Sequence, residues 1–222
     1  MHGQRTDQRH KPLSLIKAYR RAANELARGG VVALPTDTVF GLCALARDDG
    51  AVDRIYDVKG RAPDQALPLF VGSVEQACLI TEWNVAAAAL AEALWPGALT
   101  LVLRRSPAFD TRAAAGGGTI GVRVPDDAAI REIASQIGPL TATSANRSGA
   151  PECRSADEVR RQLGDSVDFI VDAPVQTNAR PSTVVDCADA NTVRILRAGE
   201  VTRERIERAL AAGGWRGTVA DG

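Results

Sequence analysis

Segments with helical periodicity alternate with short apolar segments along most of this chain. Apolar residues recur at helical spacing from Leu15 to Leu26, and Gly29 and Gly30 end that pattern. Residues 31–34 follow directly and are all apolar, as expected for a short buried strand. The same alternation continues to about residue 211. It predicts one α/β domain with a twisted, largely buried mixed sheet that is flanked by helices.

The pattern predicts seven helices and eight strands. Ser73 and Ser155 are followed three residues later by Gln76 and Glu158, which is the spacing of a helix-capping box. Helices are predicted over 15–26, around 52–56, after Ser73, over 85–94 and 128–137, after Ser155, and over 202–211. Strands are predicted over 31–34, 67–71, 99–103, 120–124, 140–143, 169–171, 183–185 and 193–196. Residues 1–12 and 213–222 are expected to be flexible tails, so the folded domain is predicted to span 13–212.

The charge balance argues against an extended nucleic-acid surface. Lys plus Arg and Asp plus Glu number 27 each, so the formal net charge is zero. No apolar stretch approaches the roughly 20 residues that a membrane-spanning helix needs. Residues 1–12 are polar and do not resemble a signal peptide. We therefore expect a cytoplasmic protein without a membrane segment.

Several common catalytic arrangements are absent from the sequence. The two histidines, His2 and His10, both lie in the predicted tail, which makes a Ser-His-Asp triad improbable. The four cysteines are widely spaced and predict mostly buried thiols, and we expect no metal site. Neither a G-x-x-x-x-G-K-[ST] loop nor a G-x-G-x-x-G fingerprint occurs. Any nucleotide site must therefore be of a less common type.

Five segments combine small polar residues, Gly or Pro, and cations between the predicted elements. They cover residues 35–42, 59–65, 95–100, 119–125 and 142–149. Loops at strand ends are where α/β proteins place ligand-binding groups. Lys59 and Arg61 flank Gly60, an arrangement that suits a polyphosphate, although a solvated helix end is the simpler alternative. Arg123 shares one strand face with Thr119 and could pair with a carboxylate, unless it is a surface Arg on an edge strand.

Taken in order, these segments resemble the YrdC-type threonylcarbamoyl-AMP synthase family in its short, single-domain form. The matching motifs are PTDTVFGL, KGR, WPGALT, TIGVRVP, TSANRSG, PSTVVD and LRAG, and they extend over about residues 15–210. The resemblance implies an α/β fold with a large concave cavity. It also implies a nucleotidyltransferase that joins L-threonine, bicarbonate and ATP into threonylcarbamoyl-AMP and releases pyrophosphate. That product would serve a partner complex that makes N6-threonylcarbamoyladenosine in tRNA.

The resemblance assigns residues to two substrates. It implies that L-threonine contacts Thr38, Arg123, Ser182 and the backbone of Ala142. For ATP it implies Lys59, Arg61, Gln65, Thr119, Ser144, Asn146, Glu152 and Arg197. A magnesium ion would accompany ATP, held mainly by phosphates and water. Weak direct binding of tRNA is a further expectation.

The sequence departs from the family pattern at four positions. Gln65 stands where a Lys or Asn is frequent, and Ala66 where a Pro or Gly is frequent. Phe70 replaces a His that some members carry near the threonine pocket, and Phe40 replaces a frequent Tyr. Phe70 cannot donate a hydrogen bond, and Phe40 loses one hydroxyl. Gln65 and Phe70 fall in the region that would tune substrate choice.

Two other functions fit part of the pattern. A non-catalytic RNA-binding module of the same fold could hold RNA phosphate in a positively lined cavity, but zero net charge and 4% aromatic residues argue against it. A paralogous enzyme could use the same cavity for another substrate. The carbamoyl-transfer module of hydrogenase maturation factors is another form of this second alternative. That module sits in a longer chain with zinc-finger segments, which this sequence does not show.

Overall fold

The computed structural model describes residues 12–175 and 180–222. The predicted tail over 1–12 therefore lies almost wholly outside the described residues. Within them the chain forms seven α-helices and two short 3-10 helices. The α-helices are α1 (Leu13–Ala27), α2 (Asp49–Lys59), α3 (Val74–Ile80), α4 (Val85–Leu94), α5 (Ala128–Ile137), α6 (Ala156–Leu163) and α7 (Arg203–Ala212). The 3-10 helices are η1 (Arg112–Ala114) and η2 (Gly164–Ser166).

Helix caps explain why several helix starts were predictable. Asn84 accepts the Ala87 N–H and starts α4, and Asp127 accepts two N–H groups at the start of α5. Ser73 Oγ accepts the Gln76 N–H as predicted, but the Gln76 side chain accepts from Gly72 N instead of closing the box on Ser73. The Glu158 carboxylate likewise accepts from Arg154 N, one residue before the cap.

Eleven strands form two mixed sheets within the described residues, where the sequence predicted one. They are β1 (Val32–Pro35), β2 (Phe40–Cys43), β3 (Leu69–Phe70), β4 (Leu99–Arg104), β5 (Thr119–Arg123), β6 (Leu140–Thr141), β7 (Thr143–Ser144), β8 (Phe169–Ile170), β9 (Thr183–Asp186), β10 (Thr192–Arg197) and β11 (Thr218–Asp221). The smaller sheet has the order β7-β2-β1-β8, and the larger has the order β11-β10-β9-β4-β5-β3-β6. The α/β class and the single domain are confirmed.

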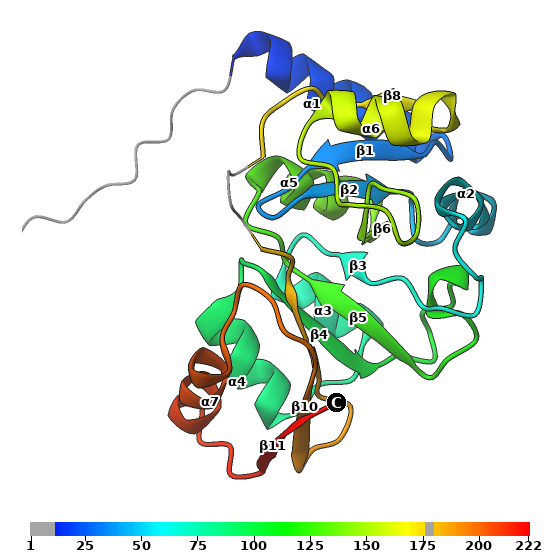
Figure 1. The fold of residues 1–222 in the computed structure, drawn as a ribbon. Helices are drawn as coiled ribbons and strands as arrows, with labels where there is room; N and C mark the ends of the chain where they lie inside the picture. The colour runs from blue at the N-terminus through cyan, green and yellow to red at the C-terminus, as the bar shows by residue number, and fades with distance from the viewer. Residues whose placement is uncertain (1–11, 176–179) are drawn as a thin grey trace, which may run out of the picture.

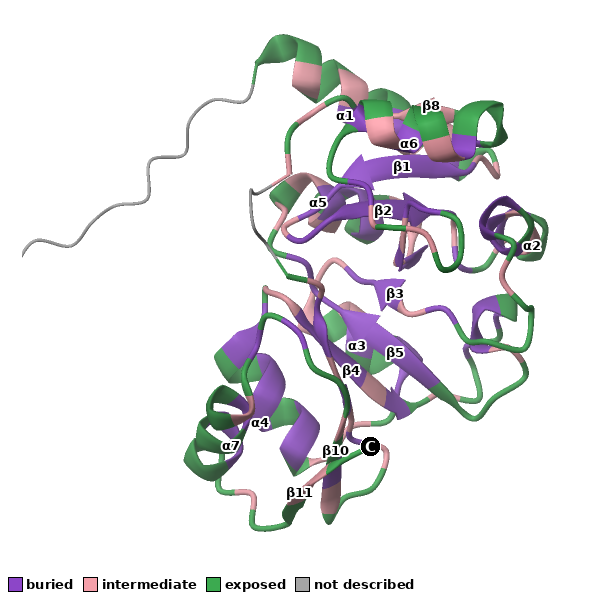
Figure 2. Cartoon of the chain, viewed as in Figure 1, coloured by how far each residue is buried: buried purple, intermediate pink, exposed green. Residues whose placement is uncertain are grey.

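The two sheets occupy the upper and lower parts of the molecule in Figure 1. Helices α4 and α7 contact each other beside the lower sheet, and α1 contacts α5 in the upper part. The strands in the middle of both sheets are buried, whereas the outer faces of α1 and α6 are exposed (Figure 2). Two apolar clusters result, a large one centred on the lower sheet and a smaller one between α1, α5 and β1.

Two predicted boundaries are wrong. Helix α2 does not stop before Lys59 but includes it as its last residue, and Gly60 ends it in the left-handed conformation at φ 60°. Residues 213–222 are not a flexible tail, because β11 pairs in parallel with β10 along the edge of the larger sheet. The indole of Trp215 donates to Ala190 O at 2.8 Å and fixes the turn that leads into this strand.

Candidate active site

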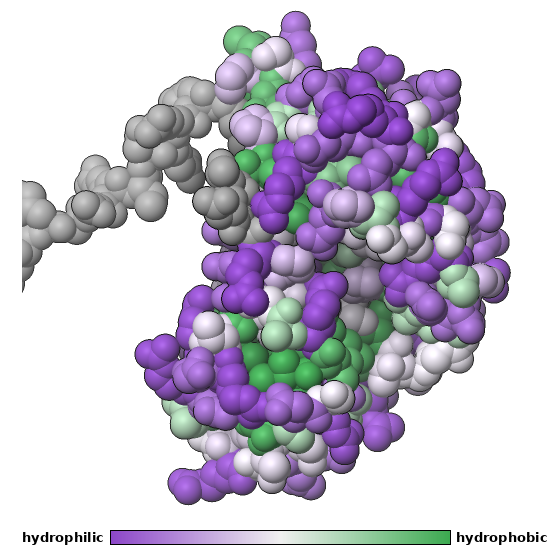
Figure 3. All heavy atoms as spheres, viewed as in Figure 1, coloured by the Kyte–Doolittle hydropathy of each residue, from purple (hydrophilic) through white to green (hydrophobic). Residues whose placement is uncertain are grey.

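A cavity of about 650 Å³ opens between the two sheets. Figure 3 shows the hollow near the centre of the molecule, with apolar surface in its lower wall. The β1–β2 turn and the segment 142–149 line it from the upper part, and strands of the larger sheet line it from below. All twelve predicted site residues line this one cavity, namely Thr38, Lys59, Arg61, Gln65, Thr119, Arg123, Ala142, Ser144, Asn146, Glu152, Ser182 and Arg197.

Lys59 ties the end of α2 to the segment after β7. Its ammonium donates to Ser144 O at 2.5 Å and to Asn146 O at 2.8 Å, while Lys59 O accepts the Ser148 N–H. The residue is buried. Burial, with repulsion from Arg61 second, lowers the pKa of Lys59 to about 8. The Lys59 ammonium is therefore held in the cavity wall by two carbonyls, and a backbone hydrogen bond to Ser148 fixes the residue further.

Arg61 and Asn146 each present an unpaired polar atom. Arg61 donates from Nη2 to Ala66 O at 2.9 Å, but its Nε is buried without a partner. Asn146 donates from Nδ2 to Arg147 O and Ala150 O, which leaves its Oδ1 buried and unpaired. A buried donor or acceptor without a partner costs about 1–3 kcal/mol. Both residues line the cavity.

Arg123 is held in place by three neighbours. Its Nη2 donates to Asp37 Oδ1 at 2.6 Å, its Nε donates to Gly97 O at 2.8 Å, and its Nη1 lies 3.3 Å from Thr38 Oγ1. Arg123 is therefore not a surface residue of an edge strand, since β5 lies between β4 and β3. Burial lowers the pKa of Arg123, and Asp37 opposes that shift.

Thr36 fixes the direction of the Thr38 hydroxyl. Thr36 Oγ1 donates to Val39 O at 2.7 Å and accepts the Thr38 N–H at 3.0 Å. Since a hydroxyl has one proton, Thr38 must be the donor in the 3.0 Å bond between the two hydroxyls. Thr38 therefore offers a ligand an acceptor and not a donor.

Ser182 sits between a hydroxyl and a cation. Its Oγ lies 3.0 Å from Thr100 Oγ1, and Arg197 donates from Nη2 to its carbonyl at 2.8 Å and to its Oγ at 3.1 Å. Two hydroxyl protons are present and one is used between the two hydroxyls, so one remains for a ligand. Thr100 is not among the predicted site residues, although it ends the segment WPGALT, one of the five polar segments.

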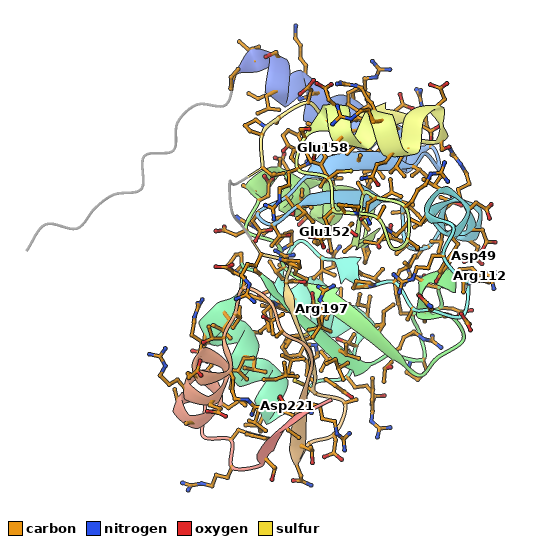
Figure 4. The ribbon with its side chains drawn as sticks, in the orientation of Figure 1. Asp49, Arg112, Glu152, Glu158, Arg197 and Asp221 are labelled. Atoms are coloured by element: carbon orange, nitrogen blue, oxygen red, sulfur yellow. The ribbon has the colours of Figure 1, made fainter. Side chains whose placement is uncertain are left out.

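The other predicted residues complete the walls. The Ala142 N–H donates to Pro68 O at 2.7 Å, which leaves its carbonyl as the group a ligand can reach. Gln65 and Thr119 are exposed at the cavity margin. Glu152 is the one carboxylate among the described residues that line the cavity. Figure 4 places Glu152 on the upper side and Arg197 on the lower side of the gap between the sheets.

Both phenylalanines that depart from the family pattern line the cavity. Phe70 is buried, and its ring lies 5.8 Å from the Arg123 guanidinium. A guanidinium near an aromatic face is attracted by the ring quadrupole. Phe40 is fully buried in β2. Phe70 therefore packs beside Arg123 and offers no hydrogen bond there.

Neither a metal-ion cluster nor a membrane-spanning helix occurs in the part of the chain that the structure describes. No group of three or more His, Cys, Asp or Glu residues there could hold a metal ion. None of the described helices is long and apolar enough to cross a bilayer. Cys43, Cys153 and Cys187 are buried free thiols, and Cys78 is exposed.

These features define a class of protein, namely an α/β protein with a cation-lined cavity between its two sheets. The cavity wall carries four cations and one carboxylate, with hydroxyl and backbone groups between them. Such a cavity can position an anionic substrate and cancel charge at a reacting phosphorus.

Comparison with known proteins identifies the family. The Sua5/YciO/YrdC family, described as "Telomere recombination", matches residues 24–199, and the chain belongs to this family. The Bacillus subtilis threonylcarbamoyl-AMP synthase is 38% identical over 193 residues, which cover 86% of this chain and 56% of the relative. The Vibrio parahaemolyticus threonylcarbamoyl-AMP synthase is 34% identical over 185 residues, covering 82% of this chain and 98% of the relative.

A solved structure extends the similarity to three dimensions. The crystal structure of P. abyssi Sua5 complexed with L-threonine superposes with a TM-score of 0.82 at 35% identity. The match covers 86% of this chain and 57% of that protein. The fold and family predicted from the sequence are confirmed.

Proposed function

We propose that this protein is a threonylcarbamoyl-AMP synthase, a nucleotidyltransferase that makes threonylcarbamoyl-AMP and pyrophosphate from L-threonine, bicarbonate and ATP. The observation that carries the proposal is the convergence of all twelve predicted residues on one cavity. Relatives that span most of this chain are named for the same activity. A structure of one relative is described as complexed with L-threonine.

L-Threonine is assigned to the end formed by Thr38, Arg123, Ala142 and Ser182. Thr38 and the Ala142 carbonyl accept hydrogen bonds and suit the donors of the amino acid. Arg123 and the spare hydroxyl proton at Ser182 or Thr100 donate and suit its carboxylate. This complementarity supports an amino acid as the ligand.

ATP is assigned to the remaining predicted residues, of which Arg197 borders the threonine residues through its bonds to Ser182. The assigned residues are Lys59, Arg61, Gln65, Thr119, Ser144, Asn146, Glu152 and Arg197. Arg61 Nε and Asn146 Oδ1 need one acceptor and one donor, which a nucleotide can supply. The cations among these residues favour a triphosphate, because hydrogen bonds between ionised partners are stronger than those between neutral groups.

The reaction requires that the two substrates are positioned for attack and that the charge on the phosphate oxygens is neutralised. The threonine amine and bicarbonate give a carbamate and water, and a carbamate oxygen then attacks the α-phosphorus while the bond to pyrophosphate breaks. No side chain has to form a covalent bond. Lys59 and Arg61 would stabilise the charge that develops on the phosphate oxygens, and the residues assigned to L-threonine would hold the amino acid in line.

Magnesium would bind with the nucleotide and neutralise part of the triphosphate charge. Glu152 is the one lining carboxylate in the described part of the chain, which fits an ion held mainly by phosphates and water with one carboxylate at most. Transfer of the product to a tRNA-modifying complex, weak contact with tRNA and a cytoplasmic location stay predictions.

Pyrophosphate release tests the proposed function. The purified chain should release pyrophosphate from ATP and bicarbonate only when L-threonine is added, and L-serine or glycine should support less release. Threonine-independent release or no release would contradict it. Binding of tRNA without ATP binding would favour the RNA-binding module instead.

A further inference from the structure

Arg123 is the one cation among the lining residues that is neutralised by a close carboxylate. Its pair with Asp37 has an N–O distance of 2.6 Å, and the two side chains are 5% and 7% exposed. Asp37 lies in the turn between β1 and β2, and Arg123 ends β5, so the pair joins the two sheets. Asp37 does not itself line the cavity.

The other three cations have no carboxylate in contact, and Glu152 is the one lining carboxylate in the described part of the chain. Within the described residues, Lys59, Arg61 and Arg197 have no carboxylate within 4 Å. Lys59 and Arg61 instead donate to backbone carbonyls, and Arg197 donates to both oxygen atoms of Ser182. Formal charge is therefore unevenly distributed in the cavity. The Arg123–Asp37 pair beside Thr38 is balanced, whereas Lys59 and Arg61 near the end of α2, and Arg197 beside Ser182, are not paired with a carboxylate.

We propose that Asp37 determines ligand specificity by neutralising Arg123, so that the amino-acid end accepts a zwitterion and the polyphosphate is directed to the unpaired cations. L-Threonine carries one positive and one negative charge and needs no net charge from its site. A free Arg123 would attract any anion, including the triphosphate. This inference rests on the proposed function and adds the residue that separates the two substrates.

A purely structural role for Asp37 predicts something different. A buried ion pair that only joins two sheets would, when broken, destabilise the fold and weaken every ligand together. A specificity role changes the ratio of affinities for zwitterionic and anionic ligands. The useful probe is 2,3-dihydroxybutanoate, in which a hydroxyl replaces the α-ammonium group of threonine and leaves a net charge of minus one.

The first experiment uses the unaltered protein. Calorimetry should show that the Kd of L-threonine changes less than about twofold between low and high salt, whereas the Kd of ATP rises about tenfold or more. A Kd for L-threonine that rises with salt as steeply as that of ATP would overturn the proposal. This test stands even if no Asp37 variant folds.

The second experiment uses two variants and a matched control. Asp37→Asn should shift the ratio of Kd values toward 2,3-dihydroxybutanoate over L-threonine by about fivefold or more, and Asp37→Glu should keep the ratio near that of the unaltered protein. Asp157→Asn removes the same charge from an exposed 2.6 Å pair with Arg160 and should change the ratio less than about twofold.

The outcomes separate this inference from the proposed function. If the unaltered protein makes pyrophosphate with L-threonine but Asp37→Asn leaves the ratio unchanged, or weakens both ligands equally, the inference fails and the function stands. If the unaltered protein binds ATP but not L-threonine, both fail.

Discussion

At the scale of single residues, the cavity holds polar groups whose bonding is incomplete. Arg61 Nε and Asn146 Oδ1 are buried and unpaired, and Thr38 and Ser182 each keep hydrogen-bonding capacity for a ligand. A buried polar group without a partner lowers the stability of the protein, and a ligand that bonds to such a group gains that free energy on binding. They are therefore the positions where substitution should affect binding more than stability.

Arg61→Ala should lower kcat/KM for ATP at least about tenfold, because a charged hydrogen bond contributes roughly 1.5–3 kcal/mol. Steady-state pyrophosphate release measures the loss, and denaturant unfolding should show little change. Arg112→Ala is the matched control, because Arg112 is exposed, pairs with Asp53 and does not line the cavity. Equal effects of the two substitutions would remove Arg61 from the mechanism.

ATP affinity should fall as the pH rises through about 8. The pKa of Lys59 is lowered from 10.5 to about 8, so the folded protein loses this positive charge there. The unfolded chain keeps the proton up to about 10.5. Between these values the unfolded state binds more protons, so the contribution of Lys59 to the free energy of unfolding rises with pH. Weaker ATP binding across this range would therefore not reflect unfolding.

Calorimetry of ATP binding from about pH 7 to about pH 9 checks this, together with denaturant unfolding at each pH. Lys59→Arg is the control, since its guanidinium stays charged over this range. An inflection that persists unchanged in Lys59→Arg would assign the titration to another group.

At the scale of elements, local patterns predicted the helices and most strands, and pairing decided the rest. The bounds of α4 and α5 match the predicted 85–94 and 128–137, because caps and apolar periodicity are local signals. The sequence predicts the residues of β2 as part of a ligand loop. All four of them are buried, so apolar and polar residues do not alternate as they do in a half-buried strand. Its strand character comes from antiparallel pairing with β1.

In the candidate site, too, local motifs predict some features and long-range packing decides the others. The twelve predicted residues come from motifs and line one cavity, whereas the sequence assigns Asp37 no role of its own. Its partner Arg123 lies 86 positions away in the sequence. No local pattern indicates that contact, which depends on how the two sheets pack. The division into two sheets was unpredictable for the same reason, since strand order is a non-local property.

Trp215→Ala should lower the free energy of unfolding by about 2 kcal/mol, because the half-buried indole packs on the core and donates to Ala190 O. Because β11 pairs with β10, and β10 ends at Arg197, ATP affinity should also weaken. Denaturant unfolding and calorimetry measure the two effects. If residues 213–222 were a free tail, the substitution would change neither quantity.

At the scale of the whole molecule, the cavity is where the two sheets face each other. The β1–β2 turn and the segment 142–149 form one wall, and strands β4, β5, β9 and β10 form the other. Bound ligands would therefore contact both sheets at once. Any ligand that binds only the native state stabilises it in proportion to the logarithm of its concentration over Kd.

ATP and L-threonine should therefore raise the melting temperature together. At 100 times its Kd each ligand adds about 2.7 kcal/mol to the free energy of unfolding, which corresponds to a rise of roughly 5–10 °C for a chain of this size. If the ligands share one cavity, each should also lower the Kd of the other by ordering the facing wall, so the combined rise should exceed the sum of the two single rises. Thermal unfolding with each ligand alone and with both measures this, and Arg61→Ala should lose the ATP part while keeping the threonine part. Strictly additive shifts would mean that the two ligands bind without contact through the shared cavity.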